Sequence, residues 1–384
     1  MLDDLARILA EAVDHAESFP LNPLLSLEHP EDAQKSTVQE LWNGSAVRDE
    51  IPWATTYKWR CQQTFQTRKL DLVWLEDKQE QRELMSCWPL KAQPLSSRWF
   101  TAELQFPEAL AELGSWLDHG RAAVVKPRHA ACGQGLTVLQ PGATEPERLQ
   151  ALEDAFKVEC KKGETWQLYQ VAKGVGVEEV YPSVGASLKE PDRPLELKLQ
   201  TIWGRVLGGT IHTSQDVWIT ADGHVLRCDA RKGGIRRKYG PLPEWILDGG
   251  LESLLKEHWE FLVTETEAIA RCWGLDEVRV DWFLGCSTLG PRICEVTWMG
   301  TGDRIPPQLQ LPVAQAFFAG HRRRLAKDQM ELPKASGAAS GAGGPCVLYR
   351  RPGTTEGEFL AEHGTELGSA KDALGDGADA SGPK

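Results

Sequence analysis

The chain has 384 residues, more than a single core needs, and this length corresponds to two or three domains at ~100 to 200 residues per domain. Hydrophobic residues make up 41% and charged residues 26%, and no stretch approaches the ~18 to 20 consecutive apolar residues of a membrane-spanning helix. The net charge of -12 disfavours nucleic acid as a partner, because phosphate backbones repel an acidic surface. We therefore expect a globular protein with no membrane span and no nucleic-acid partner.

Nine scattered cysteines, an odd number with no C-x-x-C pair, indicate reduced thiols and neither a disulfide framework nor a zinc site of recognisable spacing. Asp3 and Asp4 stand where a signal peptide carries positive charge. These two features predict a cytoplasmic protein in a reducing compartment.

The first 110 residues are predicted to form an N-terminal subdomain. Its amphipathic first helix follows from apolar residues at three- and four-residue intervals over 2–13. Tryptophan-bearing segments at 56–65 and 70–75 are predicted to be short strands. Near the other end, a Gly/Ala/Ser/Asp mixture cannot bury enough apolar surface to fold, so 329–384 is predicted to be a disordered tail.

Between these regions, the pattern alternates helices with strands and hairpins. Helices are expected at 108–120, about 146–160 and about 251–273. Strands or hairpins are expected at 122–126, 136–140, 175–181, 196–213, 217–229, 278–286 and 291–298. The glycine turn at 131–135 is predicted to join two strands, unlike a P-loop, which opens a helix.

A lysine beside a glycine turn forms the first chemical pattern. Lys126 ends an apolar strand, and Gly133 and Gly135 follow it. A lysine there places a charge against phosphate oxygens while loop N–H groups fold over them. A surface lysine beside a plain hairpin turn is the alternative.

The second pattern joins two consecutive strands. Arg279 and Asp281 share one face of the first strand, and Glu295 and Thr297 share one face of the next. If the strands pair, two carboxylates converge, which suits Mg²⁺ bound to phosphates. Arg279 would stabilise charge on a transferred group. A solvated ion-pair cluster is the alternative.

These patterns, in this order, resemble the ATP-grasp superfamily, and more narrowly its TupA-like group, named for teichuronopeptide synthesis. The matching stretches are K-P-R-H-A-A-C-G at 126–133, E-E at 178–179, E-L-K at 196–198, R-V-D at 279–281 and E-V-T at 295–297. The last two also resemble D-Ala-D-Ala ligases, where R-V-D-F precedes E-V-N. The resemblance spans about 100–305 and implies an α+β ATP-grasp fold of two lobes that clasp ATP. The expected divisions are 1–110, an N-lobe at 111–165, a C-lobe at 166–328 and the tail at 329–384.

The resemblance also implies roles for individual residues. Lys126 and Lys198 would bind ATP phosphates under the loop of Gly133 and Gly135, and Arg279 and Lys198 would be catalytic. His129 is a further candidate for phosphate or substrate, with a structural histidine as the alternative. The main chain at Glu178, Glu179 and Tyr181 would meet adenine, and Asp281, Glu295 and Thr297 would hold Mg²⁺.

The activity implied is ATP- and Mg²⁺-dependent joining of a carboxylate to an amine through an acyl-phosphate, with small molecules or polymer ends as substrates. The loop sequence H-A-A-C-G-Q-G is poorer in glycine than the family pattern, and this departure keeps two alternatives open. One is a catalytically weak nucleotide-binding or scaffold protein with the same fold. The other is an ATP-grasp phosphotransferase.

Overall fold

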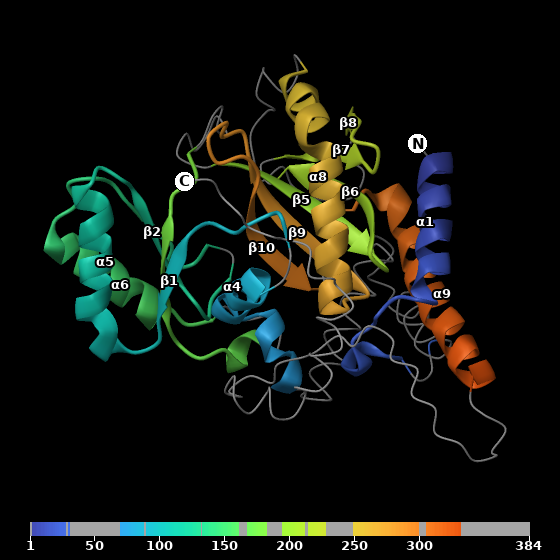
Figure 1. Ribbon diagram of the computed structural model, residues 1–384, viewed down its shortest axis with the longest axis horizontal. Helices are drawn as coiled ribbons and strands as arrows, with labels where there is room; N and C mark the ends of the chain where they lie inside the picture. The colour runs from blue at the N-terminus through green and yellow to red at the C-terminus, as the bar shows by residue number, and fades with distance from the viewer. Residues whose placement is uncertain are drawn as a thin grey trace, which may run out of the picture.

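The computed structural model describes residues 2–27, 30, 70–87, 90–131, 133–160, 167–182, 194–211, 214–227, 249–298 and 305–331. These residues form helices and two antiparallel sheets, so the predicted α+β class is confirmed. The smaller sheet and its helices form a lobe at one end of the molecule (Figure 1). No helix in these ranges combines the length and apolar character needed to cross a membrane. The predicted strand at 56–65 lies outside the described residues, as does the predicted tail at 329–384 apart from 329–331, which belong to a helix.

The small sheet has four strands in the order β1-β4-β2-β3. Their bounds are β1 Ser97–Phe100, β4 Val175–Glu179, β2 Ala123–Pro127 and β3 Thr137–Leu139. Helices α5 (Phe106–Asp118) and α6 (Glu145–Lys157) pack on one face, because Val125, Val175 and Val177 alternate toward them. The other face carries the charged side chains of Lys126 and Glu178, together with the ring of Trp99.

The glycine turn joins β2 to β3 as an antiparallel hairpin, as the sequence predicts. Gly133 and Gly135 take φ values of 70° and 65°, the left-handed region that favours glycine.

The small sheet pairs β1, which belongs to the predicted N-terminal subdomain at 1–110, with β4, which belongs to the predicted C-lobe at 166–328. The four divisions predicted for the chain stay a prediction.

The large sheet has six strands in the order β10-β9-β5-β6-β7-β8. Their bounds are β5 Leu195–Ile202, β6 Arg205–Ile211, β7 Ser214–Thr220, β8 Val225–Arg227, β9 Glu277–Leu284 and β10 Arg292–Trp298. Helix α8 (Gly250–Trp273) covers the apolar face, where Val278, Val280 and Trp282 of β9 are buried. The Trp282 indole N–H donates to the Thr266 hydroxyl of α8 at 3.0 Å. Alternation along β9 therefore directs its polar residues to the opposite face.

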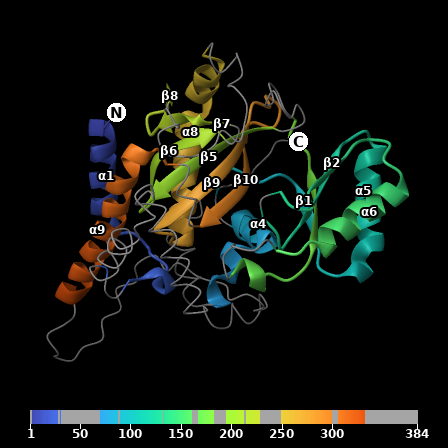
Figure 2. The ribbon, with the colours of Figure 1, turned by 180° about the vertical axis from the view of Figure 1, so that it is seen from behind.

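Helices α1 (Leu2–Ala16) and α9 (Pro307–Glu331) pair at the end of the large sheet away from the small lobe (Figures 1 and 2). The predicted amphipathic first helix is confirmed, because Leu5, Leu9 and Ala12 of α1 are buried. On α9, the guanidinium of Arg323 donates to Asp14 of α1 at 2.6 Å.

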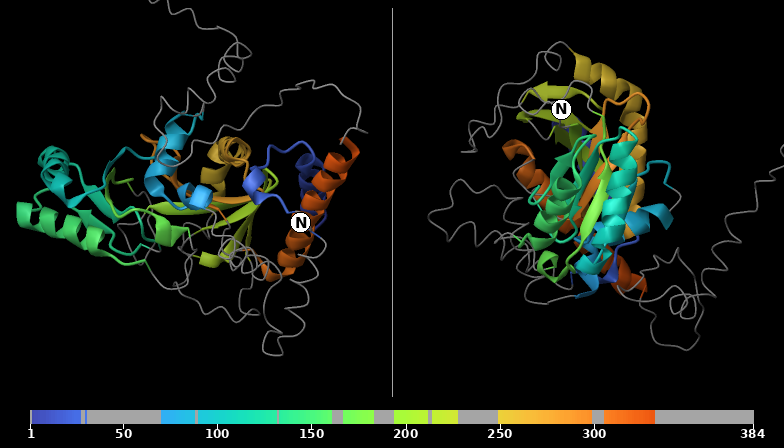
Figure 3. Two further views of the ribbon diagram at one scale, coloured as in Figure 1. Left: turned by 90° about the horizontal axis from the view of Figure 1, so that it is seen from below. Right: turned by 90° about the vertical axis from the view of Figure 1, so that its left-hand side faces the viewer.

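The short helix α4 (Lys78–Cys87) lies between the small lobe and the large sheet, and Figure 3 shows this position. The segment before it, η2 (Leu70–Leu75), is a 3₁₀ helix. The prediction of a strand at 70–75 is therefore wrong. The cause is its composition, since a nearly continuous apolar run has no period that separates a strand from a buried helical turn. The remaining 3₁₀ turns are η1 Pro23–Leu25, η3 Glu103–Gln105 and η4 Leu168–Gln170.

Candidate active site

The polar face of the large sheet is organised around Asp281 in the middle of β9. Asp281 stands opposite Lys198 of β5 on one side and opposite Glu295 of β10 on the other. The register of β10 shifts at a β-bulge between Ile293 and Glu295. The predicted pairing of the two strands is therefore confirmed, and it brings the two carboxylate-bearing positions side by side.

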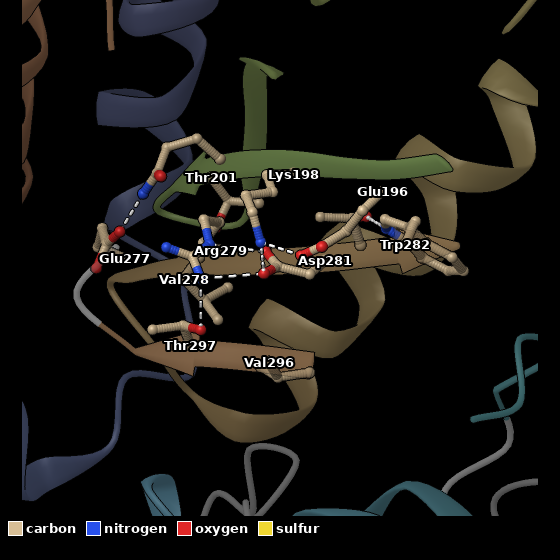
Figure 4. Close-up of polar contacts among 12 residues, drawn as sticks. Glu196, Lys198, Thr201, Glu277, Val278, Arg279, Asp281, Trp282, Val296 and Thr297 are labelled. Carbon is tan, nitrogen blue, oxygen red and sulfur yellow. Dashed lines mark hydrogen bonds and ion pairs between the residues drawn. The ribbon is translucent and has the colours of Figure 1, made fainter. Parts of the chain in front are cut away.

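Asp281 holds two cations (Figure 4). Its carboxylate accepts from Arg279 Nε at 2.7 Å and from Arg279 Nη2 at 3.0 Å. Lys198 Nζ donates both to Asp281 and to Glu196. The hydroxyl of Thr297 accepts from Arg279 Nη2 at 3.0 Å. Asp281 is fully buried, and a buried charge persists only where opposite charge and hydrogen bonds compensate it.

The electrostatics of this network keep it ionised. Burial alone would raise the pKa of Asp281, but the charges of Arg279 and Lys198 and their hydrogen bonds hold the pKa well below its ordinary value. For Arg279, burial alone would lower the pKa, but the charge of Asp281 and its hydrogen bonds outweigh burial and raise the pKa above its ordinary value. Both partners are therefore charged at neutral pH.

A second charged group lies on the polar face of the small sheet. Lys126 Nζ of β2 donates to Glu178 Oε2 of β4 at 2.7 Å and lies 5.8 Å from the ring centroid of Trp99. The Trp99 ring covers Gly176, where an added Cβ would come within 2.6 Å of the ring. Burial lowers the pKa of Lys126, although Glu178 opposes this shift.

The two groups share a neighbour. Cys294, at the bulge of β10, is half-buried, and loss of hydration raises the pKa of its thiol well above the ordinary value; Glu196, Asp281 and Glu295 act in the same direction. Lys126 acts on the same thiol in the opposite direction. Arg82 of α4 links the two groups directly, because its Nη2 donates to Glu178 Oε2, the oxygen that Lys126 binds, at 2.9 Å and to the Cys294 carbonyl at 2.8 Å.

The sequence-predicted residues near the glycine turn differ in their surroundings. His129 Nε2 lies 2.9 Å from the Val158 carbonyl, and its Nδ1 accepts the Gly174 N–H at 3.4 Å, so both ring nitrogens have partners. Gly135 packs so closely that an added Cβ would lie 2.4 Å from Val158, whereas nothing lies within 4 Å of that position at Gly133. The roles of these residues toward phosphate stay predictions.

Beyond Glu178, the predicted adenine segment includes one firmly anchored side chain. The Tyr181 hydroxyl donates to the Gly290 carbonyl at 2.9 Å and accepts the Cys286 N–H at 3.0 Å. The Glu179 N–H donates to the Ser96 carbonyl at 2.9 Å. These contacts tie the segment to β1 and to the β9–β10 turn, and its contact with adenine stays a prediction.

Two residues of this region, Arg82 and Trp99, are not predicted from the sequence. Arg82 of α4 donates to Glu178 Oε2 at 2.9 Å and to main-chain carbonyls of β10. Trp99 of β1 covers Gly176 beside Lys126. Helix α4 has a strongly polar sequence that suggests a solvated helix, and nothing local distinguishes Arg82 from a surface arginine.

The donor set can be compared with what Mg²⁺ requires. Mg²⁺ in nucleotide sites uses one or two carboxylates and takes its remaining ligands from water and phosphates. Asp281 and Glu295 stand opposite each other and supply such a pair. Within the described ranges, no group of three or more His, Cys, Asp or Glu residues is arranged to hold a metal by itself. The residues therefore fit a cation that arrives with phosphates.

Comparison with known proteins gives structural likenesses only. No family model matches the chain, and no curated protein matches it. D-alanyl-alanine synthetase A from Vibrio cholerae O1 biovar eltor is similar at 16% identity and a TM-score of 0.38, over 65% of this chain and 64% of that one. D-alanine–D-alanine ligase from Bacillus anthracis, complexed with ATP, is similar at 12% identity and a TM-score of 0.38, over 85% of this chain and 92% of that one.

The ATP-grasp ligase PsnB, complexed with a phosphomimetic variant of its minimal precursor, Mg and ADP, is similar at 12% identity and a TM-score of 0.31, over 76% of this chain and 72% of that one. The chain spans less than two thirds of the length of the Vibrio protein. At TM-scores below 0.5, these likenesses define neither the activity nor the substrates of this chain.

Proposed function

We propose that this protein is an ATP- and Mg²⁺-dependent carboxylate–amine ligase of the ATP-grasp superfamily, in its TupA-like group. The observation that carries the proposal is the row on the large sheet in which Lys198, Asp281 and Glu295 stand directly opposite one another, with Arg279 bound to Asp281. Two cations and two carboxylates arranged in this way, with Lys126 of the second sheet linked to β10 through Glu178 and Arg82, suit a nucleotide triphosphate with its metal.

In this proposal, Lys126 and Lys198 contact the phosphates of ATP, and the turn with Gly133 and Gly135 lies over them. The main chain from Glu178 to Tyr181 meets adenine. Asp281 and Glu295, with Thr297, would hold Mg²⁺, which supplies positive charge that polarises the phosphoryl oxygens. Because Asp281 neutralises Arg279 and Lys198 before ATP binds, phosphate oxygens have to compete with Asp281 for these cations.

The reaction has two steps. An oxygen of the substrate carboxylate attacks the γ-phosphorus, and the bond to the β-phosphate oxygen breaks. ADP departs, and the product of this step is an acyl-phosphate. The amine nitrogen then attacks the acyl carbon, phosphate leaves, and a C–N bond forms as the amine loses a proton. Arg279 stabilises the negative charge of the acyl-phosphate, because its guanidinium is buried beside the metal carboxylates.

Isothermal titration with ATP, with and without Mg²⁺, tests the nucleotide site. We expect Lys126→Met to weaken Mg-ATP binding by ~10-fold or more, because one charge-assisted phosphate contact is lost. Lys157→Met is the matched control, since Lys157 is an exposed lysine on the outer helix α6. The absence of Mg-ATP binding by the wild-type protein would contradict the proposal.

Phosphate release tests the chemistry. The ligase requires both a carboxylate and an amine for release of free phosphate. Tight Mg-ATP binding without turnover on any such pair would instead indicate a nucleotide-binding scaffold. ATP consumption with a stable phosphorylated product and no free phosphate would indicate a phosphotransferase.

A further inference from the structure

Strand β10 is at the edge of the large sheet, and among the described residues its outer side pairs with a short segment at Pro94, where the Ile293 N–H donates to the Gln93 carbonyl at 3.3 Å. Helix α4 supplies partners on that side. Arg82 Nη1 donates to the Ile293 carbonyl at 3.0 Å, and Arg82 Nη2 donates to the Cys294 carbonyl at 2.8 Å. Gln81 Nε2 donates to the Val296 carbonyl at 2.9 Å. Two consecutive side chains of α4 therefore bind the main chain of β10 on both sides of Glu295.

The bulge in β10 determines which way Glu295 faces. Ile293 pairs with Trp282, and Glu295, not Cys294, pairs with Asp281, so Cys294 is the extra residue. Regular pairing would place Cys294 opposite Asp281 and turn Glu295 to the face covered by α8, because a one-residue slip reverses every side chain. The carbonyls on which Arg82 acts belong to Ile293 and to the extra residue itself.

The same guanidinium reaches the small sheet. Arg82 Nη2 also donates to Glu178 Oε2 at 2.9 Å, the oxygen that accepts from Lys126. Arg82 is buried, with its side chain only 8% exposed. A planar guanidinium with five N–H donors can serve three acceptors at once, which a lysine ammonium on a flexible stem cannot match in geometry.

We propose that Arg82 is a positioning residue that stabilises the bulge of β10, so that Glu295 faces Asp281. Arg82 also connects this bulge to the Lys126–Glu178 pair. This inference rests on the proposed function, because it gives the bulge a purpose in Mg²⁺ binding. Arg82 acts on the metal site through Glu295, and this effect should appear in the dependence of ATP binding on Mg²⁺.

Titration of ATP with Mg²⁺ and with EDTA tests this role. Mg²⁺ should strengthen ATP binding in the wild-type protein. In Arg82→Met, the ratio of ATP affinity in Mg²⁺ to that in EDTA should fall ~10-fold or more, while the affinity in EDTA itself changes by less than ~3-fold. Arg82→Lys retains the charge without the planar geometry and should lose most of the same gain. Arg98→Met is the control, because Arg98 is an exposed arginine of β1 bound to Glu112, and it should behave as wild type.

A double-mutant cycle sharpens the test. If Arg82 acts through Glu295, Arg82→Lys combined with Glu295→Gln should weaken Mg²⁺-dependent binding little more than Glu295→Gln alone. Additive losses, or an equal loss in Mg²⁺ and in EDTA for either Arg82 variant, would overturn the proposal and indicate an effect on the phosphate site, either by a direct contact with ATP or through the Lys126–Glu178 pair.

Hydrogen exchange of the ligand-free protein tests the bulge without nucleotide. Amides of β10 from Ile293 to Trp298 should exchange ~10-fold faster in Arg82→Lys than in wild type or Arg98→Met, while amides of β6 should not change. Unchanged exchange in β10 would overturn the positioning role. If the wild-type protein does not bind Mg-ATP, the ligase proposal fails, and hydrogen exchange still decides whether Arg82 stabilises the bulge. Arg82→Lys keeps the charge, so the test does not depend on whether Arg82→Met folds.

Discussion

Two buried arginine–aspartate pairs in this protein have nearly the same geometry and different surroundings. Arg128 binds Asp77 through Nε at 2.8 Å and Nη2 at 2.5 Å, and Arg279 binds Asp281 through Nε at 2.7 Å and Nη2 at 3.0 Å. Asp77 also accepts the N–H of Gln79 at 3.0 Å at the start of α4. One cation and the N-terminus of a helix thus satisfy the Asp77 carboxylate, and this pairing has a structural role.

Asp281 lies instead between two cations, and two further carboxylates act on the same network. Lys198 binds Asp281 and Glu196, and Glu295 stands opposite Asp281 and raises the pKa of Arg279. In the proposed site, these charged groups would exchange partners when a phosphate and its metal bind. The comparison teaches that pairing geometry alone does not distinguish the two pairs, whereas the number of charged groups around each pair does.

The largest effect is expected for Asp281→Asn. The substitution leaves Arg279 and Lys198 buried without their shared charge, which typically costs about 3–5 kcal/mol in the free energy of unfolding. It also removes a proposed Mg²⁺ ligand, so the rate of ATP-dependent turnover should fall ~10²-fold or more. Urea unfolding and turnover measure the two effects. A loss of stability with unchanged Mg-ATP affinity would make Asp281 a structural residue like Asp77.

Asp77→Asn should cost similar stability without affecting the nucleotide site. It leaves Arg128 buried without its counter-ion and weakens the cap of α4, so we expect a loss of about 3 kcal/mol in the free energy of unfolding. Mg-ATP affinity should stay within ~2-fold of wild type by isothermal titration. A Mg²⁺-dependent loss as large as that of Asp281→Asn would erase the distinction between the two pairs.

Glu295→Gln should affect the metal alone. Glu295 is partly exposed, so the free energy of unfolding should change by less than about 0.5 kcal/mol. Turnover should fall ~10²-fold, because the hard cation loses a charged oxygen ligand. Thermal unfolding and turnover at several Mg²⁺ concentrations check this, and wild-type turnover at all of them would exclude Glu295 as a metal ligand.

The smallest effect is in the acid dependence of stability. Because the folded-state pKa of Asp281 lies below its ordinary value of 3.8, its contribution to stability is complete above that value and is lost as pH falls toward the folded-state pKa. The free energy of unfolding should therefore drop below about pH 4, and Asp281→Asn should make this drop shallower than in wild type. Urea unfolding between pH 3 and pH 6 measures both slopes, and parallel slopes would contradict the assignment.

Local pattern predicts much of this protein because alternation and turn residues act over a few positions. The strand bearing Arg279 and Asp281, the hairpin that turns at Gly204, and the glycine turn after Lys126 are all confirmed as secondary structure. The segment 70–75 is the exception, because its apolar residues are nearly continuous and carry no period.

By itself the sequence determined which residues share a face: Arg279 with Asp281, and Glu295 with Thr297, since side chains alternate along any strand. Only the tertiary structure decided which residues stand opposite one another. The bulge at Cys294 that turns Glu295 toward Asp281 lies between two consecutive strands. The reach of Arg82 from α4 to β10 and to Glu178 depends on contacts between residues 211 and 96 positions apart. Such contacts leave no local pattern, because register and edge pairing are set by packing between distant elements and not by the propensity of the residues that make them.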